Sequence, residues 1–149
     1  MAKVLTSLYP AHLAAGLFFA RAADGLEQRG ASATLTEHRA YVVGAVLSSV
    51  SFLEARFNEF VANPFVRGSG FPPRSARRLA QALKSGRMDR LPILEKYQMA
   101  IFLAGKEPLP EGREPYQPAD LLIALRNALV HFRPEWSRPL DLPSGLLFL

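Results

Sequence analysis

The stretch from Glu37 to Ala62 constrains the fold of this chain more than any other segment. It contains no proline and is apolar on most of its sides, so it predicts one long helix at the centre of a helical core. The dipeptide Asn63-Pro64 ends it. Small residues line one side of this helix, and at that spacing they let a second helix approach closely. They are Ala40, Gly44, Ser48, Ser51 and Ala55.

The rest of the chain predicts further helices. Apolar residues recur at helical spacing, strand signals are nearly absent, and Pro and Gly mark the connections between helices. We expect helices over residues 10–28, 75–84, 91–104 and 119–133. A chain of 149 residues fits one domain, so we predict an all-α bundle of four to five helices that spans residues 1–149.

Composition excludes several classes of protein. An apolar content of 49% argues against general disorder, and the lack of cysteine excludes disulfides and thiolate metal sites. No segment reaches the ~18 uninterrupted apolar residues of a membrane span, so we expect a cytoplasmic protein that is not bound to membrane. The N-terminal apolar run reads better as a first helix than as a cleaved signal. Neither His12 nor His38 has helical metal-ligand partners, and phosphate-loop motifs are absent, so no metal or cofactor is expected.

A basic segment covers residues 74–90. It holds six basic residues and one acid, and this balance equals the net charge of +5 of the whole chain. On a helical wheel the cations lie opposite a small apolar side. A solvated helix face is the ordinary interpretation. The functional alternative is a stripe that follows the phosphates of RNA. The proposed RNA-binding residues are Arg74, Arg77, Arg78 and Lys84.

Residues 120–134 carry the most informative pattern. Leu121, Leu125, Ala128 and Phe132 form one apolar stripe, which we expect to face the core. Asn127 and His131 are four residues apart on another side. Arg126 lies five residues before His131, about 140° away around the helix.

This angle predicts a site that needs two chains. In one chain Arg126 and His131 do not point at one spot, and Ile123 and Val130 form an apolar strip between them. An apolar strip within a polar face usually has a partner. A two-fold homodimer through Ile123 and Val130 would bring the polar residues of both chains around one cleft.

The residue types in this cleft suit phosphodiester cleavage without a metal. Arginine matches phosphate oxygens with a permanent charge, and histidine gives or takes a proton near neutral pH. Asparagine offers both a donor and an acceptor. By itself this spacing is equally well explained by a solvated arginine and a histidine that caps the helix.

The segment with RNALVHF at its centre resembles the signature helix of the HEPN family, whose motif is Arg, often followed by Asn, and then four to six residues to His. Residues 41–59 resemble the long HEPN helix, with an acidic residue and an asparagine one turn apart at Glu54 and Asn58. LPILEKY at 91–97 resembles the helix before the signature. The similarity covers about residues 36–134.

The resemblance implies a dimeric helical bundle and a metal-independent endoribonuclease (an RNA hydrolase). Arg126 and His131 would be catalytic, Asn127 would assist them, and Glu54 and Asn58 would support the cleft. Many members act as toxins or in defence against phage, and a toxin would have an antitoxin protein as a further partner. The alternative is a non-catalytic module that binds RNA, a nucleotide or a protein. For Glu54 and Asn58 themselves, a polar pair that holds two helices in register is an equal alternative.

Overall fold

The computed structural model describes residues 7–29, 35–62 and 91–132, together with residues 74, 75, 78, 81, 82, 86 and 90. Four helices lie in these parts of the chain: α1 (Tyr9–Arg29), α2 (Leu35–Ala62), α4 (Ile93–Leu103) and α5 (Tyr116–Val130). None of the described residues belongs to a strand. The expected all-α fold is confirmed, and the expected helices over 10–28, 37–62 and 91–104 agree with α1, α2 and α4 to within two residues at each end.

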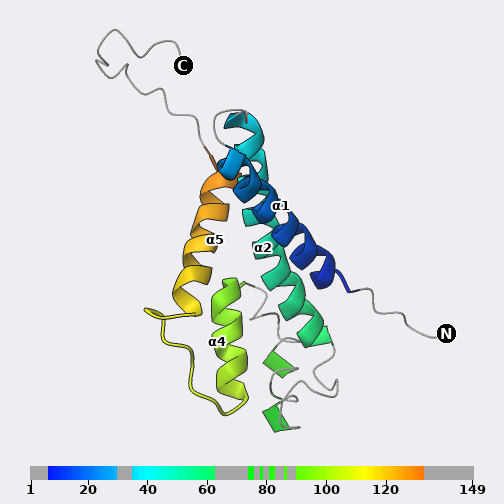
Figure 1. Ribbon diagram of the computed structural model, residues 1–149. Coiled ribbons are helices and arrows are strands. Elements are labelled where there is room, and N and C mark those ends of the chain that lie inside the picture. The colour runs from blue at the N-terminus through cyan, green and yellow to red at the C-terminus, as the bar shows by residue number, and fades with distance from the viewer. Residues whose placement is uncertain are drawn as a thin grey trace, which may run out of the picture.

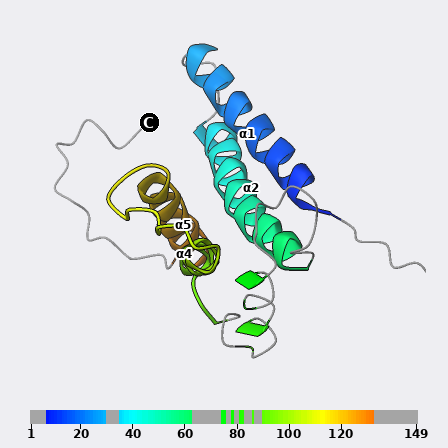
Figure 2. The same ribbon diagram turned by 90° about the horizontal axis from the view of Figure 1, so that it is seen from below.

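Helix α2 is the centre of the arrangement. It packs against α1, α4 and α5, and α4 also contacts α5. Figure 1 shows α1 running antiparallel to α2, and Figure 2 shows α2 between α1 on one side and α4 with α5 on the other. The most deeply buried large side chain is Val50 of α2, which is 1% exposed. The prediction that this segment forms the core helix is therefore confirmed.

Small residues set the close approach of α1 to α2. A Cβ atom added at Gly44 would lie 2.8 Å from Cδ2 of Phe19 on α1. One added at Gly16 of α1 would lie 3.1 Å from Oγ of Ser49. The predicted small-residue side of α2 is thus occupied by α1 at Gly44, where the ring of Phe19 takes the space of a side chain.

Helix α4 is attached to α2 through an aromatic cluster. Phe57 and Ala100 are buried at its centre, and the rings of Phe57 and Tyr97 meet edge to face, with centroids 5.3 Å apart. The hydroxyl of Tyr97 donates a hydrogen bond of 3.0 Å to the backbone carbonyl of Leu53. Tyr97 therefore fixes both how α4 packs against α2 and its position along the axis of α2.

The connection from α4 to α5 is held by a glutamine. Nε2 of Gln98 donates to the carbonyl of Leu109 at 2.6 Å, and the backbone N–H of Leu109 donates to Oε1 of Gln98 at 2.8 Å. Helix α5 then begins at Tyr116, three residues earlier than predicted. Pro118 does not prevent this, because the first-turn N–H groups of a helix have no intrahelical partner in any case.

The orientation of α5 differs from the prediction. The apolar stripe expected in the core is exposed: Leu121 is 64%, Leu125 46% and Phe132 74% exposed. The side that faces α2 and α4 carries Arg126 and Ile123 instead, with half-buried side chains. An arginine can occupy such a position because its aliphatic stem packs while its charged end finds a partner.

Helix α2 is long and apolar enough to cross a membrane by length and mean hydropathy alone, a criterion that the core helix of a bundle also meets.

The basic segment is described in part. Its described residues 74, 75, 78, 81 and 82 are helical, in agreement with the helix expected over 75–84, whose other positions lie outside the described residues. Ala82 packs against the cluster of Phe57 and Ala100.

Candidate functional site

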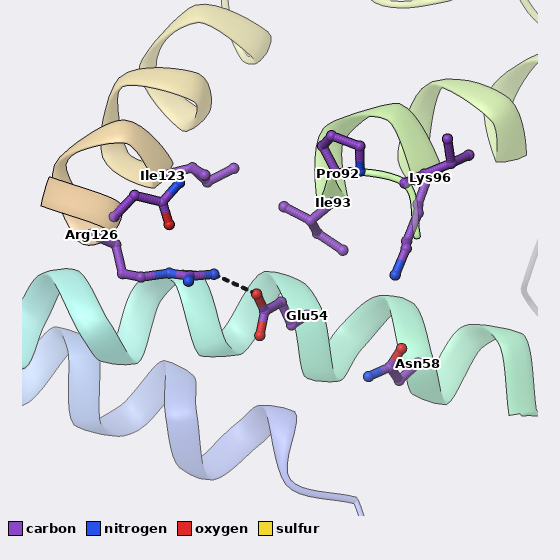
Figure 3. A pocket seen from close by; sticks show the side chains of 9 residues that line it. Glu54, Asn58, Pro92, Ile93, Lys96, Ile123 and Arg126 are labelled. Carbon is purple, nitrogen blue, oxygen red and sulfur yellow. Dashed lines mark hydrogen bonds and ion pairs between the residues drawn. The ribbon is translucent and has the colours of Figure 1, made fainter. Parts of the chain in front are cut away.

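A pocket opens where α4 and α5 meet α2. Its volume is about 410 Å³, within the range of about 300–1,000 Å³ that is typical of small-molecule sites. Figure 3 shows side chains from all three helices directed into this space. The pocket combines an apolar wall with charged and amide groups. Its lining residues are Glu54, Asn58, Leu91, Pro92, Ile93, Lys96, Ile123, Arg126 and Asn127.

An ion pair crosses the pocket from α5 to α2. Nη2 of Arg126 donates to Oε1 of Glu54 at 2.6 Å (Figure 3). The Arg126 side chain is 26% exposed and that of Glu54 is 47% exposed, so the pair is accessible to solvent on one side. A guanidinium has five N–H donors, and a contact with one carboxylate oxygen leaves others for a second anion. Glu54 therefore contacts the guanidinium of Arg126 and at the same time joins α2 to α5.

Asn58 and Asn127 complete the part of the pocket that the sequence anticipated. Asn58 follows Glu54 by one turn of α2, and Asn127 follows Arg126 on α5. Four of the five residues predicted for the site, Glu54, Asn58, Arg126 and Asn127, therefore line one cavity within a single chain. Carboxamides carry no charge and offer both hydrogen-bond donors and acceptors, so they can bind the polar uncharged groups of a molecule in the pocket.

His131 does not join them. Val130 is the last residue of α5, and His131 caps the helix, with its backbone N–H donating to the carbonyl of Asn127 at 2.9 Å. Its side chain is exposed and does not line the pocket. Five helical residues correspond to a rise of about 7.5 Å and a rotation of about 140°, which separates His131 from Arg126 in one chain.

Lys96 is a pocket residue that the sequence interpretation missed. It is the one basic residue of α4, and in Figure 3 its side chain extends from α4 toward α2. The first turn of α4 also borders the pocket. Its N-cap residue Pro92 makes no side-chain capping bond, and the helix dipole adds positive potential at this end. The available signal was a lone cation, three residues after Ile93, in a helix whose other polar residues are Glu95, Tyr97 and Gln98.

The basic segment is described only in part. Arg74 and Arg78 are exposed, as expected for either a solvated face or an RNA-binding stripe. Arg77 and Lys84 lie outside the described residues. The structure therefore places two of the four predicted RNA-binding cations at the surface.

Of the other two histidines, His38 makes an ion pair between two helices. His38 of α2 pairs with Glu27 of α1, at 2.7 Å between Nε2 and Oε1. Within the described residues no group of three or more His, Cys, Asp or Glu side chains is placed to hold a metal ion.

Comparison with known proteins adds no assignment: no family model, curated protein or solved structure matches the chain. What the site can do chemically must come from its own geometry. The described residues of the chain line a pocket with two cations, one carboxylate and two carboxamides, and a separate exposed histidine lies at the end of α5. The pocket suits an anion, and the histidine suits proton transfer.

Proposed function

We propose that the protein is a metal-independent endoribonuclease of HEPN type that acts as a homodimer. The observation that carries the proposal is the position of Arg126. Its guanidinium is fixed by Glu54 in a pocket open to solvent, while Asn127 lines the same pocket and His131 is exposed at the end of the same helix. This arrangement provides the charge and the proton-transfer group that phosphodiester cleavage requires.

The proposed reaction needs no group beyond these side chains and the RNA. His131 takes the proton of a ribose 2′-hydroxyl, and the 2′-oxygen attacks the adjacent phosphorus. The bond to the 5′-oxygen of the next nucleotide breaks, and that oxygen receives a proton. Arg126 stabilises the charge that develops on the phosphate oxygens. The products are a 2′,3′-cyclic phosphate and a 5′-hydroxyl end.

A second copy of the chain supplies the histidine. Asn127 and His131 form a polar line on α5 with exposed apolar residues on both sides: Val130, which is 55% exposed, on one side, and Ala124 and Ala128 on the other. A two-fold partner along this line would bury the apolar flanks and place both histidines in the seam. Of the two residues expected at the interface, Val130 is free to make this contact, whereas Ile123 lies in the pocket wall.

The test is cleavage of a labelled RNA in EDTA, with product ends analysed and oligomeric mass measured by sedimentation. We expect cyclic phosphate products from the unmodified dimer and none from His131→Ala or Arg126→Ala. Ala128→Glu should separate the dimer and remove cleavage together. Ala20→Glu, at an exposed helical alanine of α1, is the matched control and should change neither. Undiminished cleavage by His131→Ala would refute the assignment.

The alternative is a non-catalytic binding module, and one observation favours it. His131 lies outside the pocket that Arg126 lines, so each chain holds a complete pocket without a proton-transfer group. Folded dimers that bind RNA but leave it intact in the same assay would support this alternative. The toxin and antitoxin roles follow only from the endoribonuclease proposal.

A further inference from the structure

Lys96 has no task in the cleavage reaction proposed above, yet its side chain projects into the pocket. In Figure 3 it enters from α4, on the opposite side of the cavity from Arg126, with Ile93 and Ile123 in the space between their helices. The residue is half-buried. Among the residues that the structure describes, Lys96 makes no ion pair with a carboxylate, because Glu54 is paired with Arg126.

The charged residues that the structure describes in this pocket include one more cation than carboxylate. Among the residues that the structure describes, the lining holds two basic side chains, Lys96 and Arg126, and one carboxylate, Glu54. The excess of one positive charge matches the single negative charge of a phosphodiester. A partly desolvated cation that faces a cavity gains most from an anion that it can contact directly, since charge-assisted hydrogen bonds are the strong ones.

The uncharged part of the lining suits the rest of a nucleotide. Leu91, Pro92, Ile93 and Ile123 form an apolar wall beside the polar groups. A base has two apolar faces and a polar edge, so it can lie against such a wall while carboxamides contact its edge. Asn58 and Asn127 provide these amides in the same cavity.

We propose that this pocket binds one nucleotide unit, with its phosphate on Lys96 and its base against Ile93 and Ile123. The inference rests on the proposed function, because it makes the bound unit part of the RNA that the dimer cleaves. Lys96 is then a substrate-binding residue, and its pocket is complete in one chain.

The experiment measures binding of adenosine 5′-monophosphate, adenosine and inorganic phosphate to the full chain by titration calorimetry. We expect the nucleotide to bind more tightly than either of its parts. Lys96→Met should weaken nucleotide binding by about tenfold, the low end for a lost charge-assisted hydrogen bond. Lys96→Arg should restore most of the affinity, because it keeps the charge. Lys106→Met, at an exposed lysine just beyond α4 that does not line the pocket, is the matched control and should bind as the unmodified chain does.

Two results would overturn the inference: equal nucleotide affinity in Lys96→Met and the unmodified chain, or a nucleotide that binds no more tightly than phosphate alone. RNA kinetics separate this inference from the proposed function. Lys96→Met should raise KM and leave kcat nearly unchanged, whereas His131→Ala should remove cleavage and keep the nucleotide affinity. Nucleotide binding that depends on Lys96, in a chain that cleaves no RNA, would support the pocket and refute the endoribonuclease.

Discussion

The ion pair between Arg126 and Glu54 allows a quantitative prediction of how Arg126→Ala changes the free energy of unfolding, and every activity measured for that variant depends on this change. If the pair joins α5 to α2, then Arg126→Ala changes the stability of the fold as well as the chemistry of the site. A double-mutant cycle with Arg126→Ala, Glu54→Ala and the double variant isolates the energy of the pair from the packing of the Arg126 stem. Alanine suits both positions because it is the best helix former.

The magnitude follows from the contact and its exposure. A contact of 2.6 Å between charged groups is short, and hydrogen bonds to charged groups contribute about 1.5–3 kcal/mol when they are well shielded. Exposed ion pairs contribute only about 0.2–1 kcal/mol, because solvent screens them. With side chains 26% and 47% exposed, the pair lies nearer the exposed class, and we expect a coupling free energy of about 1 kcal/mol. A loss of this size corresponds to a fall in Tm of about 2–4 °C for a chain of this length.

The assay is urea unfolding of the four proteins, with the free energy of unfolding from linear extrapolation. As the control cycle, Arg126→Ala is combined with Glu59→Ala. Glu59 lies about 140° around α2 from Glu54 and accepts a hydrogen bond from Ser7 at 2.7 Å, so its coupling to Arg126 should be near zero. A coupling at Glu54 no larger than that at Glu59 would refute the pair. A measurable unfolding transition in Arg126→Ala would also show that this variant stays folded, as expected when about 1 kcal/mol is lost from a stability of about 5–15 kcal/mol.

Two further predictions concern the framework around the site. Gly44→Ala should lower the free energy of unfolding by about 1–2 kcal/mol, because a Cβ 2.8 Å from the Phe19 ring overpacks the α1–α2 contact by more than the gain in helix propensity. Gly25→Ala, whose nearest neighbour would be a side-chain atom at 3.7 Å, should instead raise it by about 0.5–1 kcal/mol, and a stabilising Gly44→Ala in the same urea titration would contradict the close approach. Burial raises the pKa of Tyr97 above its ordinary value of 10.0, against a smaller lowering by Arg56, so its stabilising contribution is full below about pH 10 and is lost as the pH rises through the higher pKa of the folded state. Tyr97→Phe should therefore make the free energy of unfolding less dependent on pH above about pH 10, and an unchanged dependence would refute the burial.

The sequence predicted the helices well because their signals are local. Apolar spacing, proline and glycine placed α1, α2 and α4 to within two residues, and the small side of α2 at Gly44 indicated a close helix neighbour. These signals do not require knowledge of which elements meet. Glu54 was predicted from the resemblance to the HEPN family and Arg126 from its residue type and its spacing to His131, and the structure brings both to one cavity.

The orientation of α5 and the role of Lys96 could not be predicted in this way. A helical wheel shows where the apolar stripe lies, but it cannot show that Arg126 has a carboxylate partner on α2 or that the arginine side of α5 faces inward. Lys96 is a candidate site residue only because the fold places it beside residues of α2 and α5, such as Glu54 and Asn127. Both features depend on tertiary partners that no periodicity contains.

Three consecutive residues of α4 attach it to three different surroundings. Lys96 enters the pocket, Tyr97 binds the backbone of α2, and Gln98 binds Leu109 in the connection to α5. Tyr97 and Gln98 do not line the pocket, yet their hydrogen bonds hold the helix that carries Lys96. We expect a substitution of Gln98, or a change in the length of the 104–115 connection, to alter how far Lys96 on α4 lies from Ile123 on α5, and so which nucleotide the proposed site accepts. A change in the 104–115 connection would then alter the ligand preference of the proposed site while every side chain that lines the pocket stays the same.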